Sequence, residues 1–299
     1  MKLLITGAWA CTEKQLNQIK ALGHDITFMQ NEIDNLPCNY EEVEGVICNG
    51  LFLHHPIEKF SSLKYIQLTS AGFDRVPMDY VQKNGIKIYN ARGVYSIPMA
   101  EYAICGVLDL YKKTHVLYKN QKQRKWEKQR DLLELFGKTV CIVGCGNVGT
   151  ECAKRFQAFE CKILGVDIYT REDVFYDKMY SLESLDKVLS QSDVVVLTLP
   201  LTDETRHMMN SVRFGAMKDN SVIVNIARGA IIEENALLKA LEEKLMGAVL
   251  DVFEQEPLSA DSPLWTNEKV IITPHNSFVG DGNKDRLYQV IIKNLGEKR

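Results

Sequence analysis

The sequence predicts an α/β protein of two consecutive units, each a doubly wound parallel sheet with helices on both faces. Short apolar runs alternate with helical patterns along almost the whole chain, which is typical of parallel sheets. The length of 299 residues suits two domains. A second strand–helix alternation begins at Thr139, after a long helical pattern. We therefore place the boundary between the two units near residue 98.

The composition favours a protein that handles small molecules. Hydrophobic residues make up 45% of the chain and charged residues 25%, which excludes disorder as the global state. No apolar run reaches the roughly 18 residues of a membrane span, and the run Lys2–Thr6 is too short for a signal peptide. The net charge of −3 gives no general attraction to nucleic acid or anionic lipid. We expect neither nucleic acid nor membrane as a partner.

The eight cysteines form no CxxC pair and have no histidines at zinc-finger spacing. Several lie in apolar runs such as Val140–Ile142, as small buried residues do in a reducing compartment. We therefore expect a cytoplasmic protein without a metal site. A redox role for Cys145 is the less favoured alternative.

In the first unit, the apolar run Lys2–Thr6 predicts a strand. Thr12 begins the next helix, Gln15 completes a capping box, and Gly23 ends the helical pattern. Further strands are expected in four apolar runs bounded by turn residues, namely Ile26–Phe28, Val46–Cys48, Tyr65–Leu68 and Ile86–Tyr89.

The long helical pattern begins near Pro98, which suits a first helical turn. Apolar spacing predicts one helix over Ala100–Leu117, and we interpret the basic stretch Lys119–Arg130 as a solvated helix face or connector. A last helix is expected at about Lys284–Leu295. The strands expected in the second unit are Thr139–Val143, Lys162–Val166, Asp193–Thr198, Val222–Asn225, Met246–Leu250 and Val270–Ile272.

The sharpest motif is Gly144-Cys145-Gly146-Asn147-Val148-Gly149, a GxGxxG sequence between a predicted strand and a helix. Glycines there permit a tight turn, close approach to a pyrophosphate and helix–strand packing, and the helix N-terminus attracts phosphate. Asp167 follows about 20 residues later, where an acid can bind ribose hydroxyls. Its charge would repel the 2′-phosphate of NADP, so NAD is preferred, although Arg171 lies close by. A purely structural glycine turn is the alternative.

Three charged residues follow three consecutive strands of the second unit. Arg228, Glu256 and His275 each come shortly after a predicted strand end. Ligands of doubly wound sheets bind at the carboxyl ends of the strands. One such residue alone is usually structural or a surface charge, but three at corresponding strand ends beside a nucleotide loop indicate an active site.

These motifs in this order resemble the D-isomer-specific 2-hydroxyacid dehydrogenases, the family that includes phosphoglycerate dehydrogenases. The resemblance spans nearly the whole chain. It rests on Ser70–Asp74, Glu134–Thr139, Gly144–Gly149, Leu199–Thr205, Asn225–Gly229, Asp251–Pro257 and Pro274-His275. It implies a Rossmann NAD-binding domain over 98–279 and a flavodoxin-like substrate domain over 1–97 plus about 280–299.

The resemblance also implies site residues. Arg228 matches the substrate-binding arginine, Glu256 the glutamate that supports the histidine, and His275 the acid/base. Together with Arg228 and His275, the substrate would be bound by Ser70, Ala71 and Gly72. The residues expected to bind NAD(H) are Gly144, Gly146, Asn147, Val148, Gly149, Asp167, Leu199, Pro200, Ile226, Ala227, Asp251 and Asn276.

The expected activity is NAD-dependent interconversion of a D-2-hydroxy acid and its 2-keto acid. The family implies a homodimer joined through the segment between Ala103 and Leu135. The segment Asn49–Phe52 lacks the basic residue expected for a phosphorylated substrate, so the identity of the acid stays open. Two alternatives keep the same fold, namely an NAD(H)-sensing regulatory protein with little catalysis, and an enzyme that oxidises formate or phosphite.

Overall fold

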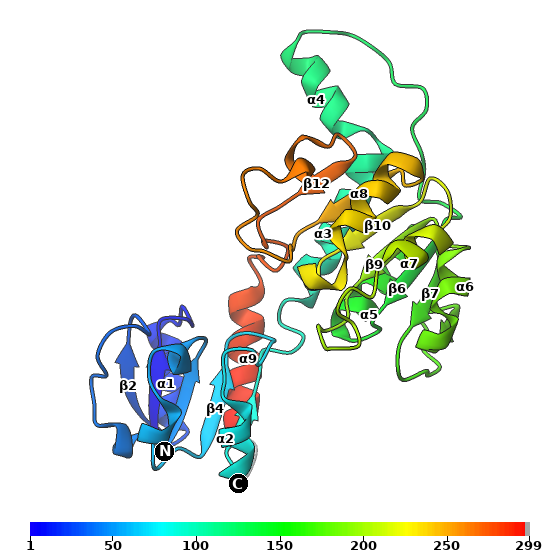
Figure 1. Ribbon diagram of the computed structural model, residues 1–299. Coiled ribbons are helices and arrows are strands. Elements are labelled where there is room, and N and C mark those ends of the chain that lie inside the picture. Colours follow the sequence, from blue (N-terminus) through cyan, green and yellow to red (C-terminus); the bar gives the residue numbers. More distant parts are fainter. Residues whose placement is uncertain (297–299) are drawn as a thin grey trace. The chain divides into compact units, whose positions relative to one another are not determined.

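The computed structural model describes residues 1–296 and divides the chain into two compact units (Figure 1). Unit 1 consists of Met1–Tyr95 and the chain from Gly280 onward, and unit 2 is Ser96–Val279. Each unit contains one parallel sheet, which confirms the predicted fold class. The first crossing between the units lies between Tyr95 and Ser96, close to the boundary expected near residue 98.

Unit 1 contains a five-stranded sheet in the order β2-β1-β3-β4-β5, the order of flavodoxin-like folds. The four further runs expected as strands in this unit coincide with strands or lie within one residue of them. The strands are β1 (Lys2–Thr6), β2 (Asp25–Met29), β3 (Gly45–Cys48), β4 (Tyr65–Leu68) and β5 (Lys87–Tyr89), and the helices are α1 (Glu13–Ala21), α2 (Met78–Lys83) and α9 (Asn283–Gly296).

Helix α1 begins and ends where the sequence predicts. The Thr12 hydroxyl accepts a hydrogen bond from the Gln15 backbone N–H at 3.3 Å, and the Gln15 side chain accepts from the Thr12 N–H at 2.8 Å. This reciprocal pair is a capping box. Gly23 follows the helix with a φ of +84°, which a residue without a Cβ adopts at no steric cost.

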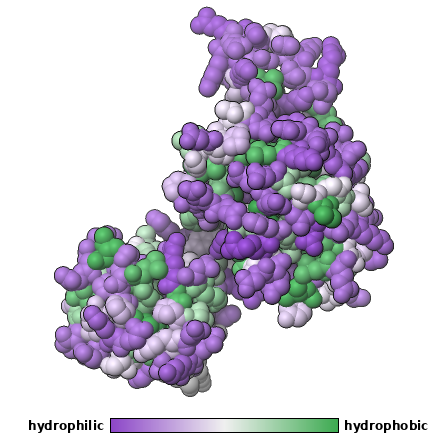
Figure 2. All heavy atoms as spheres, in the orientation of Figure 1, coloured by the Kyte–Doolittle hydropathy of each residue, from purple (hydrophilic) through white to green (hydrophobic). Residues whose placement is uncertain are grey.

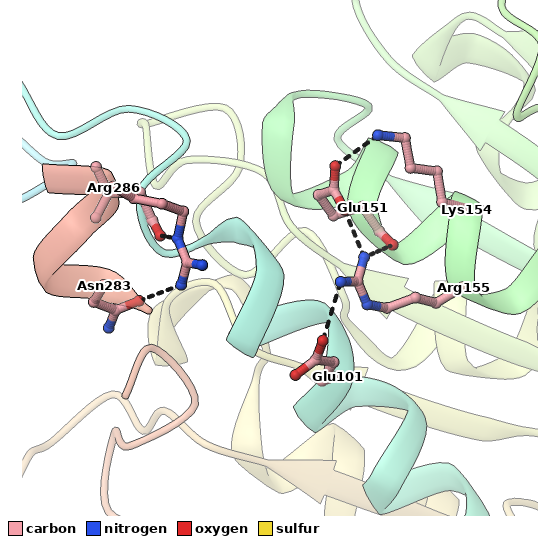
Figure 3. Close-up of polar contacts among 7 residues, drawn as sticks. Glu101, Glu151, Lys154, Arg155, Asn283 and Arg286 are labelled. Carbon is pink, nitrogen blue, oxygen red and sulfur yellow. Dashed lines mark hydrogen bonds and ion pairs between the residues drawn. The ribbon is translucent and has the colours of Figure 1, made fainter. Parts of the chain in front are cut away.

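The last helix, α9, packs into the core of unit 1. Leu287 and Ile291 of α9 are buried in one cluster with Leu3 and Ile5 of β1. At its start, Arg286 donates from Nε to the Val94 carbonyl at 2.7 Å and from Nη2 to Asn283 at 2.8 Å (Figure 3). The C-terminal helix therefore closes one face of the N-terminal sheet.

Unit 2 contains a seven-stranded sheet in the order β12-β11-β10-β9-β6-β7-β8, so the strand order reverses between β6 and β9. The six predicted strands are present, and the short edge strand β8 was not predicted. The strands are β6 (Thr139–Val143), β7 (Lys162–Val166), β8 (Lys178–Tyr180), β9 (Val194–Leu197), β10 (Val222–Asn225), β11 (Gly247–Leu250) and β12 (Val270–Ile272). The helices are α3 (Ser96–Tyr111), α4 (Thr114–Lys122), α5 (Asn147–Ala158), α6 (Leu185–Leu189), α7 (Ser211–Ala216) and α8 (Glu234–Glu243).

The prediction of one helix over 100–117 is wrong, because the helix breaks at Lys113. This residue has a φ of +50°, outside the helical region. A returning segment ends α3: the Leu133 N–H donates to the Tyr111 carbonyl at 3.0 Å, and Lys112 Nζ donates to the Leu133 carbonyl at 2.7 Å. A carbonyl at the end of the helix is thus satisfied from outside, which favours termination there.

Helix α4 and the segment that follows it extend away from the rest of unit 2 (Figure 1). Their surface is mostly hydrophilic in Figure 2. The basic stretch predicted as a helix face or connector contains both, because α4 ends at Lys122 and residues 125–135 have no regular structure. Trp126 in this segment is 96% exposed. Over residues 1–296, none of the helices combines the length and apolar character that a membrane crossing requires.

Phe156 tests the core of unit 2. It is fully buried on α5 in the cluster formed by α3, α5 and one face of the sheet. We expect Phe156→Ala to destabilise this unit by about 3–5 kcal/mol, because the truncation leaves a cavity. The measurement is the hydrogen-exchange protection of the β6 amides in unit 2. Phe159→Ala, at a position that is 42% exposed, is the control and should change protection little. Equal losses in both variants would contradict the assigned core.

Candidate active site

The turn between β6 and α5 leaves space for a ligand. Gly144 has a φ of +93°, and a Cβ there would lie 2.6 Å from the Leu199 backbone nitrogen. A Cβ on Gly149 would lie 2.2 Å from the Gly144 carbonyl oxygen. Gly146 differs, because a Cβ there would meet no atom within 4 Å. Close packing thus requires glycine at Gly144 and Gly149, whereas Gly146 faces open space.

The first turn of α5 starts at this open space. Gly146 is the N-cap, and Asn147 and Val148 are the first helical residues. Gly146 has no side chain that could cap this turn, so the helix N-terminus can offer backbone N–H donors and the positive end of its dipole to a ligand. A pyrophosphate fits this set of donors.

Asp167 lies directly after β7, next to the turn. Its carboxylate accepts the Cys145 N–H at 2.6 Å and the Tyr169 N–H at 3.1 Å. A carboxylate has about four acceptor positions, so others are left for ribose hydroxyls. Arg171 is close by, since it donates to the Cys145 carbonyl at 2.9 Å and forms an ion pair with Asp173 at 3.1 Å. Both a carboxylate and a guanidinium group therefore lie beside the turn.

Cys145 points away from this space. The residue is 1% exposed, and its Sγ lies 3.6 Å from the Ile142 carbonyl and 3.8 Å from the Val166 carbonyl. Burial raises the pKa of the thiol to about 12. The reactive thiolate is thus disfavoured at neutral pH, which argues against the redox alternative.

The clearest catalytic geometry is the pair formed by His275 and Glu256. His275 Nδ1 lies 2.8 Å from Glu256 Oε2, and the other carboxylate oxygen accepts the Phe253 N–H at 3.0 Å. The side chains are 42% and 36% exposed, so a small molecule can reach them. The pair joins the segments that follow β11 and β12, which are neighbours in the sheet. This arrangement fixes the plane and position of the imidazole ring.

Arg228 is presented by a tightly held loop after β10. The buried Asn225 side chain donates to the Arg228 carbonyl at 3.0 Å and accepts the Ala227 N–H at 3.1 Å. A Cβ on Gly229 would lie 1.8 Å from the Phe253 carbonyl carbon. Only glycine fits there, so the arginine loop lies directly against the segment that leads to Glu256.

Asp251 is fully buried, and its role in holding the chain was missed from the sequence. Its carboxylate accepts the Thr273 hydroxyl at 2.6 Å, the Asn276 N–H at 2.7 Å and the Ser277 N–H at 2.9 Å. Its carbonyl accepts the His275 N–H at 2.8 Å. Asp251 therefore holds the segment that carries the histidine.

The other residues expected near the cofactor occupy neighbouring strand ends of unit 2. Leu199 is buried against Gly144, and Pro200 is exposed directly after it. Ile226 and Ala227 are buried after β10. The structure therefore places the whole expected cofactor set at the carboxyl edge of one sheet.

In unit 1, the loop Ser70–Gly72 has its carbonyl groups engaged and its N–H groups available. Ala91 N–H donates to Ser70 O at 2.8 Å, Asn90 to Ala71 O at 2.6 Å, and the Ser70 hydroxyl to Gly72 O at 3.1 Å. Within residues 1–296, the backbone N–H groups of this loop donate to no acceptor. Consecutive backbone N–H groups of this kind can bind a carboxylate.

The structure brings a basic side chain to the loop after β3, which has none of its own. Arg75 Cδ lies 3.8 Å from the position that a Gly50 Cβ would occupy, and Arg75 is exposed. The Glu32 carboxylate holds this loop by accepting the Asn49 and Gly50 N–H groups at 2.7 and 2.6 Å. The approach of Arg75 to this loop could not be predicted from the sequence, because no motif links Arg75 to residues 49–52.

A second histidine–glutamate pair lies elsewhere in unit 2. His207 Nε2 is 3.1 Å from both oxygens of Glu254, and the two side chains are 43% and 45% exposed. Like His275, His207 has a positive φ, +49° against +51°. The pairs are alike in local geometry, but His275 is the third residue after β12, whereas His207 lies ten residues after β9.

Comparison with known proteins supports one family. Residues 104–277 match the model of the D-isomer specific 2-hydroxyacid dehydrogenase NAD binding domain. The chain is 35% identical over 241 residues to the glyoxylate reductase of Thermofilum pendens, covering 78% of this chain and 71% of that protein.

Two solved structures share the complete fold. A D-isomer specific 2-hydroxyacid dehydrogenase family protein from Aeromonas salmonicida has a TM-score of 0.84 and 34% identity over 98% of this chain and 93% of its own. The D-lactate dehydrogenase of Aquifex aeolicus, solved with NAD and lactic acid, has a TM-score of 0.78 and 27% identity over 98% and 94%. The chain therefore belongs to the D-isomer-specific 2-hydroxyacid dehydrogenases and is an NAD-dependent oxidoreductase of 2-hydroxy and 2-keto acids.

Proposed function

We propose that this enzyme interconverts a D-2-hydroxy acid and its 2-keto acid with His275 as acid/base, Glu256 as its support and Arg228 as the substrate-binding cation. The observation that carries the proposal is the 2.8 Å contact between His275 Nδ1 and Glu256. An ionised carboxylate only accepts hydrogen bonds, so Nδ1 carries a proton. Nε2 is then the nitrogen that exchanges a proton with substrate.

The substrate carries a carboxylate beside the reacting carbon. Arg228 would bind the carboxylate with two parallel hydrogen bonds and polarise the adjacent carbonyl. In unit 1, the N–H groups of Ser70, Ala71 and Gly72 suit a carboxylate oxygen. Each of these groups can orient a 2-keto acid by its carboxylate.

Proton transfer accompanies the redox step. The nicotinamide, when bound, supplies the hydride to the carbonyl carbon or accepts it from the hydroxy acid. As negative charge develops on the substrate oxygen, His275 donates its Nε2 proton there, and in the oxidation direction it takes the proton back. Glu256 stabilises the positive charge on the protonated ring and keeps it oriented.

The residues that would bind the cofactor lie in the open turn before α5 and at the strand ends of the same sheet. The Gly144–Gly149 turn, with Asn147 and Val148 N–H groups, would hold the pyrophosphate, and Asp167 the adenosine ribose. The nicotinamide side would be lined by residues at the edge of the same sheet, namely Leu199, Pro200, Ile226, Ala227, Asp251 and Asn276. NAD is preferred over NADP because the Asp167 carboxylate repels a 2′-phosphate.

We further propose a homodimer formed through the segment between Ala103 and Leu135, and a cytoplasmic location. The extended arm after α4 with its exposed Trp126 supports an interface, because large exposed aromatic side chains are typical of binding surfaces. The eight cysteines are all unpaired, which fits a reducing compartment.

The two histidine–glutamate pairs provide a matched test. We expect His275→Asn to lower kcat for 2-keto acid reduction at least about a hundredfold, because it removes the proton donor. His207→Asn makes the same chemical change in the second pair and should leave kcat unchanged. Asparagine tolerates the positive φ of both positions. The assay is NADH oxidation with glyoxylate, hydroxypyruvate, pyruvate and larger 2-keto acids, and NADH binding should persist in both variants.

The same assay separates the alternatives. Tight NADH binding with no turnover of any 2-keto acid in the wild-type enzyme would favour a regulatory NAD(H) sensor. Turnover of formate or phosphite with NAD would favour the other redox chemistry. Full activity of His275→Asn, or equal losses in the two variants, would disprove the role assigned to His275.

Asp167 tests the choice of cofactor. We expect the wild-type enzyme to bind NADH more tightly than NADPH, and Asp167→Asn to reduce this preference about tenfold, because it removes a like charge near the 2′-phosphate. The amide oxygen can still accept the Cys145 N–H, whereas the hydrogen bond from the Tyr169 N–H is lost. Dissociation constants are measured from the fluorescence of the reduced cofactors. Asp186→Asn, on α6, is the control, and an unchanged preference in Asp167→Asn would refute the assignment.

A further inference from the structure

We propose that Tyr102 is a positioning residue for the acid/base step and acts on His275 through Thr273 and Asp251. Tyr102 lies on α3, in the second turn after the helix begins at Ser96. Its hydroxyl is hydrogen-bonded to Thr273 Oγ1. This inference rests on the proposed role of His275, and it concerns a residue that neither the sequence motifs nor the assigned site includes.

The direction of the hydrogen bonds follows from the chemistry of the groups. Thr273 Oγ1 lies 2.6 Å from Asp251 Oδ1, and an ionised carboxylate can only accept, so the threonine uses its single proton there. The Tyr102 hydroxyl must then donate to Thr273. Burial raises the pKa of Tyr102 to about 12, so the phenol keeps its proton at neutral pH. The relay therefore runs from tyrosine to threonine to aspartate.

Asp251 connects the hydroxyl of Thr273 to the backbone around His275. Its fully buried carboxylate also accepts the N–H groups of Asn276 and Ser277, and its carbonyl accepts that of His275. A buried carboxylate is sensitive to the loss of a donor, because no water replaces it. If Thr273 turned its proton elsewhere, Asp251 and the backbone around His275 would have to shift.

Helix α3, which carries Tyr102, is held in place by contacts with α5 and β11. Glu101, the neighbour of Tyr102, pairs at 3.1 Å with Arg155 on α5, and Arg155 also pairs with Glu151 at 2.5 Å (Figure 3). Gly106 of α3 lies so close to β11 that a Cβ would be 2.5 Å from Val249. The same helix thus contacts α5, the strand β11 that leads into Asp251, and the segment that carries His275.

The test is the removal of one hydroxyl on α3 with a matched control. We expect Tyr102→Phe to lower kcat for 2-keto acid reduction about tenfold, because a small displacement of an acid/base group is costly in rate. The KM for the keto acid and the Kd for NADH should stay within about twofold. Tyr111→Phe makes the same change in a buried tyrosine of the same helix, whose hydroxyl is bonded to no residue among 1–296, and should leave kcat unchanged.

Thr273 provides the second set of variants. Thr273→Val abolishes both hydrogen bonds and should lower kcat at least as much, whereas Thr273→Ser keeps the hydroxyl and should restore most of it. In a relay, adding Tyr102→Phe to Thr273→Val has no further effect. Thermal unfolding of each variant identifies any loss of folded protein, and kcat is then calculated per folded molecule.

The outcomes separate this inference from the proposed function. An active wild-type enzyme with unchanged kcat in Tyr102→Phe overturns the positioning role and leaves the role of His275 intact. A fall in kcat that is matched by Tyr111→Phe, or is not relieved by Thr273→Ser relative to Thr273→Val, also overturns it. If His275→Asn retains full activity, the proposed function fails first, and the relay has no acid/base to position.

Discussion

The buried carboxylate of Asp251 is the constraint on which the segment 273–277 depends. Burying a charge is costly unless it is fully hydrogen-bonded, and all three donors to this carboxylate come from residues 273–277. The chain after β12 therefore has little choice of path. His275 lies within this path and donates its own N–H to the Asp251 carbonyl. The backbone that carries the imidazole is therefore held by the buried Asp251, which follows the neighbouring strand β11.

A histidine beside a glutamate does not by itself make a site. The pairs His275–Glu256 and His207–Glu254 have similar distances and similar exposure, and the two histidines have nearly the same φ. They differ in what surrounds them. Glu256 is fixed by the Phe253 N–H, whereas Glu254 also pairs with the exposed Arg206 at 3.6 Å. The parallel sheet supplies the difference, because it gathers three strand ends at one edge.

The sequence was informative where local patterns decide the structure. Apolar runs predicted the central strands, and glycine spacing predicted the turn before α5, because close packing forces glycine at Gly144 and Gly149. The sequence did not predict features that depend on contacts between distant residues. The helix break at Lys113 depends on Leu133, which returns to the end of α3. The donors to the Asp251 carboxylate come from the segment after β12. The approach of Arg75 to Gly50 is likewise a tertiary contact with no local signal.

Asp167 and Asp251 both follow strands of one sheet, but their carboxylates differ in burial and in hydrogen-bond partners. The carboxylate of Asp167 is half-buried and accepts two backbone N–H groups, so acceptor positions are left for a ligand's hydroxyls. Asp251 accepts three donors from its own chain and has no exposed surface. An acid with spare acceptor positions can select a ligand, whereas an acid whose positions are mostly taken acts on the backbone that it holds. The same residue type at equivalent strand ends is thus suited to ligand recognition at Asp167 and to holding the backbone at Asp251.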